Sequence, residues 1–173
     1  MGQLISYTSP VGVHQLARVE PISGVEPTYT VSTVTQNGAF LIRFRLARAA
    51  TFTKMGYYVG AAAGNVDLGL YTGNTAEDTF TRIASTGTTA AAGTNAVQEI
   101  ALTASITLQA GIDYWAAFAT DSATVTLARL NSGLTNLVGN GNKVITKATS
   151  FVLPTSIATP SATSITPYLV LVP

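Results

Sequence analysis

Cysteine is absent from this chain of 173 residues, which also contains only one histidine. Without cysteine, no disulfide, thiolate nucleophile or cysteine-ligated metal can form. His14 stands alone, so a zinc site would need carboxylate or water ligands, and no G-x-S-x-G segment supplies a nucleophilic serine. We therefore expect His14 to be an ordinary contact or a solvated residue, and the protein to be neither an enzyme nor a cofactor binder.

Charge is also scarce in this sequence. Charged residues make up 10% of the chain, against roughly a quarter in an ordinary soluble domain. Nine basic and eight acidic residues leave a net charge of +1, and they are dispersed along the chain. This balance argues against a nucleic-acid partner. Because a surface with few charges is typical of a protein covered by partner subunits, we expect an oligomer or a larger assembly.

Long hydrophobic runs are missing as well. The residues after Met1 lack the basic and apolar regions of a secretory signal, and no stretch is apolar for long enough to span a membrane. We expect a soluble protein that is made in the cytoplasm and has no membrane span.

What the sequence does contain is a series of short runs rich in Thr, Val and Ala, separated by Gly and Asn turns. This spacing predicts an all-β fold, an antiparallel, jelly-roll-like β-sandwich over residues 28–173. Residues 1–27 carry prolines and scattered apolar side chains, which predict an extended N-terminal arm. A Ser/Thr/Pro-rich connection is expected at 154–167. Beyond the first two strands, we expect strands at residues 54–59, 66–71, 80–85, 97–108, 112–120, 124–131, 143–153 and 164–172.

The first two strands are predicted to form a hairpin. Residues 29–34 alternate in polarity, and the following Asn37-Gly38 pair is a typical hairpin turn. In the second strand, the even-numbered apolar residues of 40–46 share one face, whereas Arg43 and Arg45 lie on the other. We therefore expect one face to join the core and the arginine face to meet solvent or an acidic partner.

Carboxylates are the remaining route to catalysis or metal binding. A pair of them could serve a glycosidase, but Asp113 and Asp121 lie in turn sequences, where we expect them to cap the backbone. Glu77 and Asp78 could bind calcium, although the D-x-[DN]-x-[DN]-G spacing is absent, so a solvated loop is the simpler interpretation. Residues 139–143 lack Walker spacing and are expected to form a turn. The carboxylates on or beside expected strands are Asp67, Glu99, Asp113 and Asp121.

Aromatic rings offer a different function, because flat rings on a sheet face can stack against sugars. Trp115 lies among alanines, which favours core packing, and only one of the adjacent Tyr57 and Tyr58 can face outward. The candidate glycan contacts are Tyr58 and Tyr71.

Three segments carry a resemblance to a known family: GNVDLGLY at 64–71, RIASTG at 82–87 and ITLQAGIDYWAAF at 106–118. Together they resemble a β-sandwich module of tailed-bacteriophage virion proteins, over about residues 52–130. The shared features are a Val-x-Leu-x-Leu-Tyr strand and a later Leu-x-x-Gly-x-x-Tyr-Trp turn. The resemblance implies a place in the virion, as a capsid decoration, head-fibre or tail-fibre-tip protein, commonly a homotrimer. It carries no catalytic residue.

We therefore expect a structural or accessory virion protein that docks onto capsid or tail proteins through its N-terminal arm. The alternative is a module of a tail fibre or tip that binds a host-surface glycan or receptor. Sparse charge favours the first, and few rings are available for the second. The candidate partner contacts are Leu4, Ile5, Val11, Val13, His14, Leu16, Arg43 and Arg45.

Overall fold

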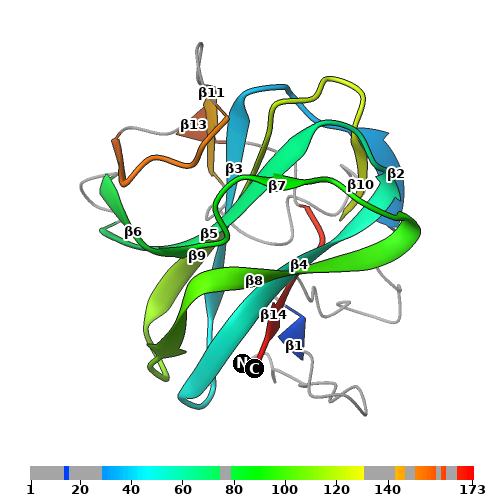
Figure 1. Ribbon diagram of the computed structural model, residues 1–173. Helices are drawn as coiled ribbons and strands as arrows, with labels where there is room; N and C mark the ends of the chain where they lie inside the picture. The colour runs from blue at the N-terminus through cyan, green and yellow to red at the C-terminus, as the bar shows by residue number, and fades with distance from the viewer. Residues whose placement is uncertain are drawn as a thin grey trace, which may run out of the picture.

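The computed structural model describes residues 14–15, 29–74, 79–130, 143–146, 151–158, 161–162 and 167–173. Over these residues the chain forms strands and turns and no helix. The strands make two antiparallel sheets packed face to face, so the fold is all-β and sandwich-like, as the sequence predicted (Figure 1). Within the described ranges, no helix exists that could cross a membrane.

Sheet A is built around β4 (Ala50–Ala61) and has six strands in the described part of the chain. One edge of β4 pairs with β8 (Thr94–Leu108), and its other edge pairs with β14 (Leu169–Val172) and β10 (Thr126–Leu130). Two outer strands complete the sheet, β2 (Tyr29–Thr33) beyond β10 and β1 (His14–Gln15) beyond β14.

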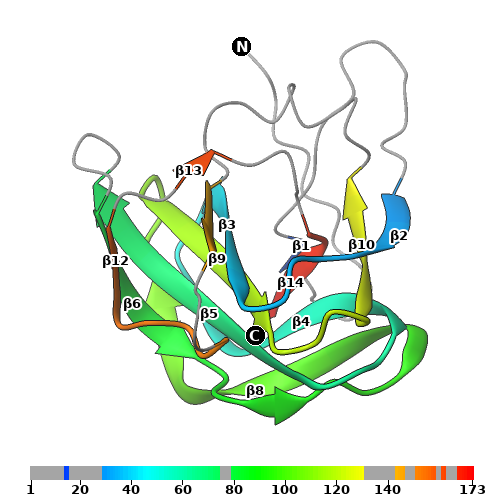
Figure 2. The same ribbon diagram turned by 90° about the horizontal axis from the view of Figure 1, so that it is seen from above.

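Sheet B has eight strands among the described residues, with β5 and β9 at its centre (Figure 2). Its strands follow one another in the order β12, β6, β5, β9, β3, β11, β13, and β7 also pairs with β5. Their bounds are β3 (Gly38–Arg45), β5 (Asn65–Asn74), β6 (Thr79–Ser85), β7 (Thr89–Ala90), β9 (Asp113–Thr120), β11 (Lys143–Thr146), β12 (Ser156–Ala158) and β13 (Ser161–Ala162).

The first core lies between the two sheets. Because side chains alternate along a strand, Phe40, Ile42 and Phe44 of β3 point into this core, while Arg43 and Arg45 are exposed, as predicted. The aromatic rings of Tyr57 from sheet A and Phe118 from sheet B meet inside it, with centroids 5.1 Å apart. This core is contributed by both sheets and holds them together.

A second core covers the other face of sheet B. There Trp115 packs edge-on against Phe80 at a centroid distance of 4.9 Å, beneath Leu153 and Ile157 from the segment 151–158. Both faces of β9 are therefore buried, which explains its nearly continuous apolar sequence. Trp115 is a core residue, as its small neighbours predicted.

The predicted hairpin over residues 29–46 is wrong. β2 pairs with β10 in sheet A, whereas β3 pairs with β9 and β11 in sheet B. The turn between them carries Asn37 at φ 57°, and the backbone N–H of Asn37 donates to the Thr120 carbonyl at 2.8 Å. The turn residues are those expected, but the chain crosses from one sheet to the other instead of folding back.

The C-terminal third also differs from expectation. Of the predicted strand at 143–153, β11 covers Lys143–Thr146, and the described residues 151–153 lie outside any strand. The predicted connection at 154–167 contains β12 and β13. β12 pairs with β6 and so brings segment 151–158 over sheet B. The Ser/Thr/Pro-rich sequence of this connection shows no sustained alternation that would have revealed the two short strands.

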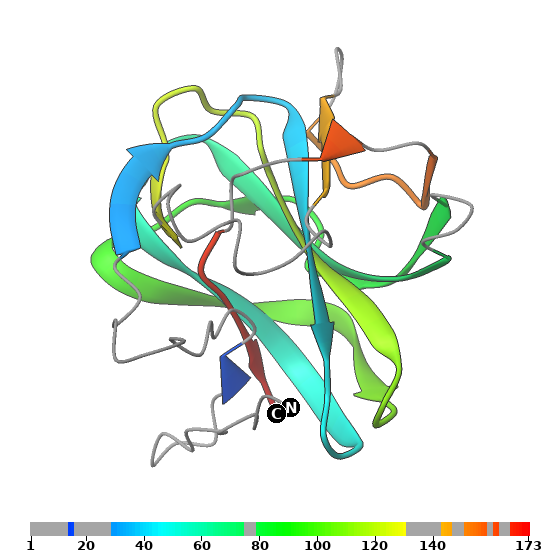
Figure 3. The same cartoon turned by 180° about the vertical axis from the view of Figure 1, so that it is seen from behind.

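Only His14 and Gln15 of the predicted arm lie among the described residues. They form β1, in which His14 is paired with Leu171 and Gln15 with Val170 of β14. Figure 3 shows β1 and β14 side by side at one end of sheet A. The predicted contacts Leu4, Ile5, Val11, Val13 and Leu16 lie outside the described residues, so they remain predictions.

Candidate functional site

The two predicted glycan contacts have opposite environments. Tyr71 is fully buried in the second core, and its hydroxyl donates to the Pro154 carbonyl at 2.7 Å. Burial raises the pKa of Tyr71 well above its ordinary value. The prediction that Tyr71 contacts a glycan is therefore wrong, because segment 151–158 covers the face on which this ring lies.

Tyr58 lies on the outer face of sheet A and is partly exposed. Its neighbour Tyr57 points into the first core, where the Tyr57 hydroxyl donates to Gln98 Oε1 at 2.9 Å. Burial raises the pKa of Tyr57 to about 12. The prediction that one of these adjacent rings faces inward and the other outward is confirmed.

Two exposed valines share this outer face with Tyr58. Val97 of β8 is paired directly with Tyr58 and is 44% exposed. Val31 of β2 is 50% exposed, and a Cβ placed on Gly60 would lie 2.1 Å from its Cγ1. We call Val31, Tyr58, Val97 and the glycines between them the outer patch.

The glycines of the outer patch, Gly56 and Gly60, stand two residues before and after Tyr58 and therefore lie on the same face. A Cβ on Gly56 would be 2.9 Å from the Val170 side chain and 3.3 Å from Val97. These positions need glycine because side chains of neighbouring strands lean over β4. The glycines are themselves buried beneath these side chains, which therefore flank the Tyr58 ring.

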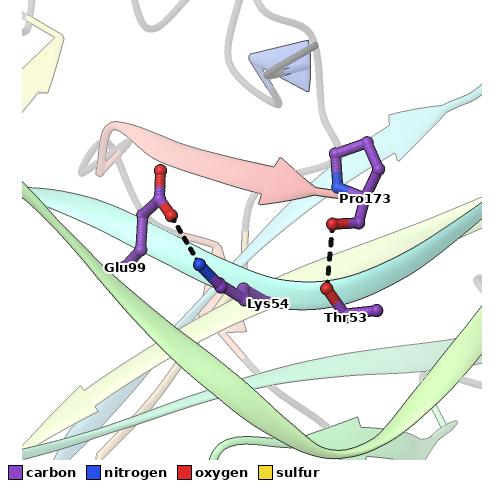
Figure 4. Close-up of polar contacts among 4 residues, drawn as sticks. All are labelled: Thr53, Lys54, Glu99 and Pro173. Carbon is purple, nitrogen blue, oxygen red and sulfur yellow. Dashed lines mark hydrogen bonds and ion pairs between the residues drawn. The ribbon is translucent and has the colours of Figure 1, made fainter. Parts of the chain in front are cut away.

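An ion pair borders the outer patch. Lys54 Nζ lies 3.2 Å from Glu99 Oε2, and both side chains are exposed (Figure 4). Beside it, the Thr53 hydroxyl donates to the carbonyl of Pro173 at 2.8 Å, which fixes the C-terminal end of the chain to β4. Because exposed ion pairs contribute little to stability, the pair mainly neutralises this part of the surface.

The predicted arginine face is present on sheet B, with Arg43 and Arg45 both exposed. Arg45 Nε lies 2.9 Å from Asp113 Oδ1, and this hydrogen bond lowers the pKa of the Asp113 carboxyl. We had expected Asp113 to cap a turn. Instead it begins β9 and pairs with Arg45, which lies opposite it on β3. Half of the arginine face is thus neutralised within the chain.

Asp121 does hold a turn, but mainly through a distant partner. Its carboxylate accepts hydrogen bonds from the backbone N–H of Asn65 at 2.6 Å and from the Asn65 side-chain amide at 2.7 Å. These bonds lower the pKa of Asp121. The carboxylate ties the start of β5 to the end of β9 and serves the fold.

Asp67 is the one described carboxylate that is fully buried. Its Oδ2 accepts the backbone N–H of Leu153 at 2.9 Å, and its Oδ1 has no hydrogen-bond partner. Burial raises the pKa of Asp67, against the opposing effects of the Leu153 bond and the nearby Arg82 charge. The guanidinium of Arg82 also donates to the Leu153 carbonyl, so both side chains fasten segment 151–158 to sheet B.

The described carboxylates therefore lie apart from one another, each bound to a structural neighbour. Across the ranges that the structure describes, no group of His, Asp or Glu side chains could hold a metal ion. Glu77, Asp78 and most of residues 139–143 lie outside those ranges, so the alternatives weighed for them stay untested.

Comparison with known proteins gives no identification, since neither a family model nor a curated protein matches this chain.

The sequence pointed to Tyr58 but missed most of the outer patch. Val31 lies in a run that alternates in polarity and Val97 in a strand with weak alternation, and neither pattern showed which face would point outward. A usable signal was the glycine on each side of Tyr58, at Gly56 and Gly60, because glycine inside a strand often marks close approach of other groups.

Proposed function

We propose that this protein is a non-enzymatic structural or accessory protein of a tailed-phage virion, a capsid decoration or head-fibre protein that works as a homo-oligomer. The observation that supports a contact role is the outer patch, where two valines and a tyrosine are exposed on a sheet with few charges. Apolar residues grouped on one face are typical of interaction surfaces. The virion location rests on the resemblance of residues 52–130, which also implies a trimer.

A structural role also agrees with how the described carboxylates are used. Asp67, Asp113 and Asp121 each bind a backbone or side-chain group of the same chain. None of these contacts leaves a carboxylate pair facing a common space, as glycoside hydrolysis would need. In this proposal the arm, residues 1–27, docks onto capsid or tail proteins, because its sparse apolar residues cannot form a core alone.

The location is tested on purified virions. We expect an antibody against this chain to label particles banded in a density gradient, at regular positions in electron micrographs. A version lacking residues 1–19 should fold but fail to add back to particles that were stripped of the protein. Absence of the chain from banded particles would contradict the virion assignment, and unchanged add-back of the shortened version would contradict docking through the arm.

Glycan binding is the second candidate, and the exposure of Tyr58 favours it. A partly exposed ring on a sheet face offers a flat surface against which a sugar can stack. On a glycan array, this function requires saccharide binding that is lost in Tyr58→Ala and kept in Tyr114→Phe, a change inside the first core. Binding that survives Tyr58→Ala, or no binding at all, would leave the structural role as the better account.

A further inference from the structure

Three described strands of sheet A leave one edge without a partner strand, β8, β2 and the two-residue β1, and the two longer ones are built differently. Among the described strands, β8 pairs only with β4 and β2 pairs only with β10, so each strand leaves one edge without a partner strand. Such an edge presents backbone N–H and C=O groups that can pair with another chain, and proteins usually protect it with charges, prolines or bulges. The presence or absence of these protections shows which edge is available.

The edge of β8 is protected. Near the beginning of β8, Asn95 takes a positive φ of 50°. The register between β8 and β4 also shifts between the pairs Phe52–Ile106 and Lys54–Ala101. Glu99 adds a charge in the regular segment between these irregularities. A strand that paired with the regular segment would lie beside this charge, and two copies joined there would bring their Glu99 charges close together.

The residues of β2 themselves carry none of these protections, and the charge that reaches the strand comes from Arg129 of β10, whose guanidinium donates to Ser32 Oγ at 2.9 Å. Residues Tyr29–Thr33 of β2 include no charge and no proline, and all of them keep one register with β10, from the pair Leu130–Tyr29 to the pair Thr126–Thr33. At its centre stands Val31, which is 50% exposed. The strand is thus short, regular and apolar at its midpoint.

We propose that β2 pairs antiparallel with β2 of a second copy of this chain, about a two-fold axis through Val31. This proposal deepens the homo-oligomer of the proposed function and rests on it. The sequence of β2 is self-complementary in this register, because Val31 meets Val31, Thr30 meets Ser32 and no like charges face each other. Sheet A then continues across the axis and joins the two outer patches.

The two-fold interface has a consequence for the size of the assembly. An isologous contact closes on itself as a dimer, so larger assemblies built from it contain an even number of copies. The resemblance to virion modules instead implies a trimer. The proposed β2 interface therefore replaces a simple three-fold ring with a dimer or a multiple of dimers.

Cysteine cross-linking tests the interface, since the natural chain contains no cysteine. Opposite residues of antiparallel strands have Cα atoms roughly 4.5 to 5.5 Å apart, which is within the range of a disulfide. We expect Val31→Cys to form a disulfide-linked dimer under mild oxidation, and the dimer to separate on reduction. The matched control is Val97→Cys, which has similar exposure on the same outer face but lies on the protected edge, and it should remain mostly unlinked.

A second pair of variants keeps the test independent of disulfide chemistry. Val31→Lys places two ammonium groups face to face at the axis and should shift the assembly to a smaller mass, whereas Val97→Lys should leave the mass unchanged. The proposal is overturned if Val97→Cys links as fast as Val31→Cys, or if Val31→Lys keeps the natural mass. In either case a natural chain that is still assembled would leave the proposed function standing, while a monomeric natural chain would reject both.

Discussion

The outer face of sheet B and the outer face of sheet A show how the same kind of strand can serve two purposes. On sheet B, segment 151–158 covers Tyr71 and Trp115 and turns that face into a second core. On sheet A, Tyr58 and Val97 of the outer patch stay exposed. The difference lies in what covers each face, because both faces carry aromatic and small side chains.

Polar groups sharpen this comparison. The cover over sheet B is fastened by hydrogen bonds to the backbone of residues 153–155. Asp67 accepts from the Leu153 N–H, and Tyr71 and Arg82 donate to backbone carbonyls of this segment. The outer patch instead has an exposed ion pair, Lys54 with Glu99, at its border. Substitutions on the outer face of sheet B should therefore change the free energy of unfolding. Substitutions on the outer face of sheet A should instead change association with other copies.

The largest effect is expected from Trp115→Ala. Trp115 is 1% exposed and packs against Phe80, so its removal leaves a cavity and should lower the free energy of unfolding by about 3–5 kcal/mol. Urea denaturation followed by circular dichroism measures this loss. A loss below about 1 kcal/mol, the size typical of an ordinary substitution, would show that the second core is not a true core.

Tyr71→Phe should have a smaller effect, because it keeps the ring and removes only the hydroxyl. The Pro154 carbonyl then loses its donor, and we expect a loss of about 1–3 kcal/mol. Tyr58→Phe is the matched control on sheet A and should leave the free energy of unfolding nearly unchanged. Equal losses from the two variants would remove the distinction between the two faces.

Asp67→Asn should change the pH dependence of stability. The native-state pKa of Asp67 is raised above its ordinary value of 3.8, so between these two pKa values the folded state binds more protons than the unfolded state. The contribution of Asp67 therefore falls as the pH rises through the native pKa. Relative to Asp67→Asn, the natural protein should lose stability as the pH rises above the ordinary carboxyl pKa of 3.8 and through the raised native-state pKa.

The difference between these two proteins isolates Asp67. Asp113 and Asp121 have lowered pKa values, so their contributions change in the opposite direction, but they are present in both proteins and cancel. Unfolding measured at several pH values gives the difference directly. A difference that is constant with pH, or that rises with it, would contradict a raised pKa at Asp67.

The smallest effect on stability is expected at the border of the outer patch. Lys54→Ala removes an exposed ion pair and should cost about 0.2–1 kcal/mol. Thermal unfolding in low and high salt measures this, and any loss should shrink as salt screens the pair. A salt-independent loss of several kcal/mol would mean that Lys54 has a packing role that the exposed ion pair does not explain.

The sequence allowed the faces of β3 over residues 42–45 and the buried position of Trp115 to be predicted, because polar and apolar residues alternate in the first and small residues surround the second. It did not reveal that Leu41, on the arginine face, is buried in the second core. It could not show which sheet a strand joins. Asn37-Gly38 makes a turn whether the chain folds back or crosses over, so the hairpin was predicted wrongly. Tyr58 and Tyr71 looked equivalent for a similar reason, since only the cover supplied by segment 151–158 distinguishes them.

The central claim is that sheet A meets a second copy of this chain through the edge of β2, while the outer face of sheet B is covered within the chain. Sedimentation equilibrium of the natural protein at micromolar concentration tests it most directly. The account predicts an assembled species whose mass is an even multiple of the 17.9 kDa chain. A single species of 17.9 kDa that does not change with concentration would contradict it.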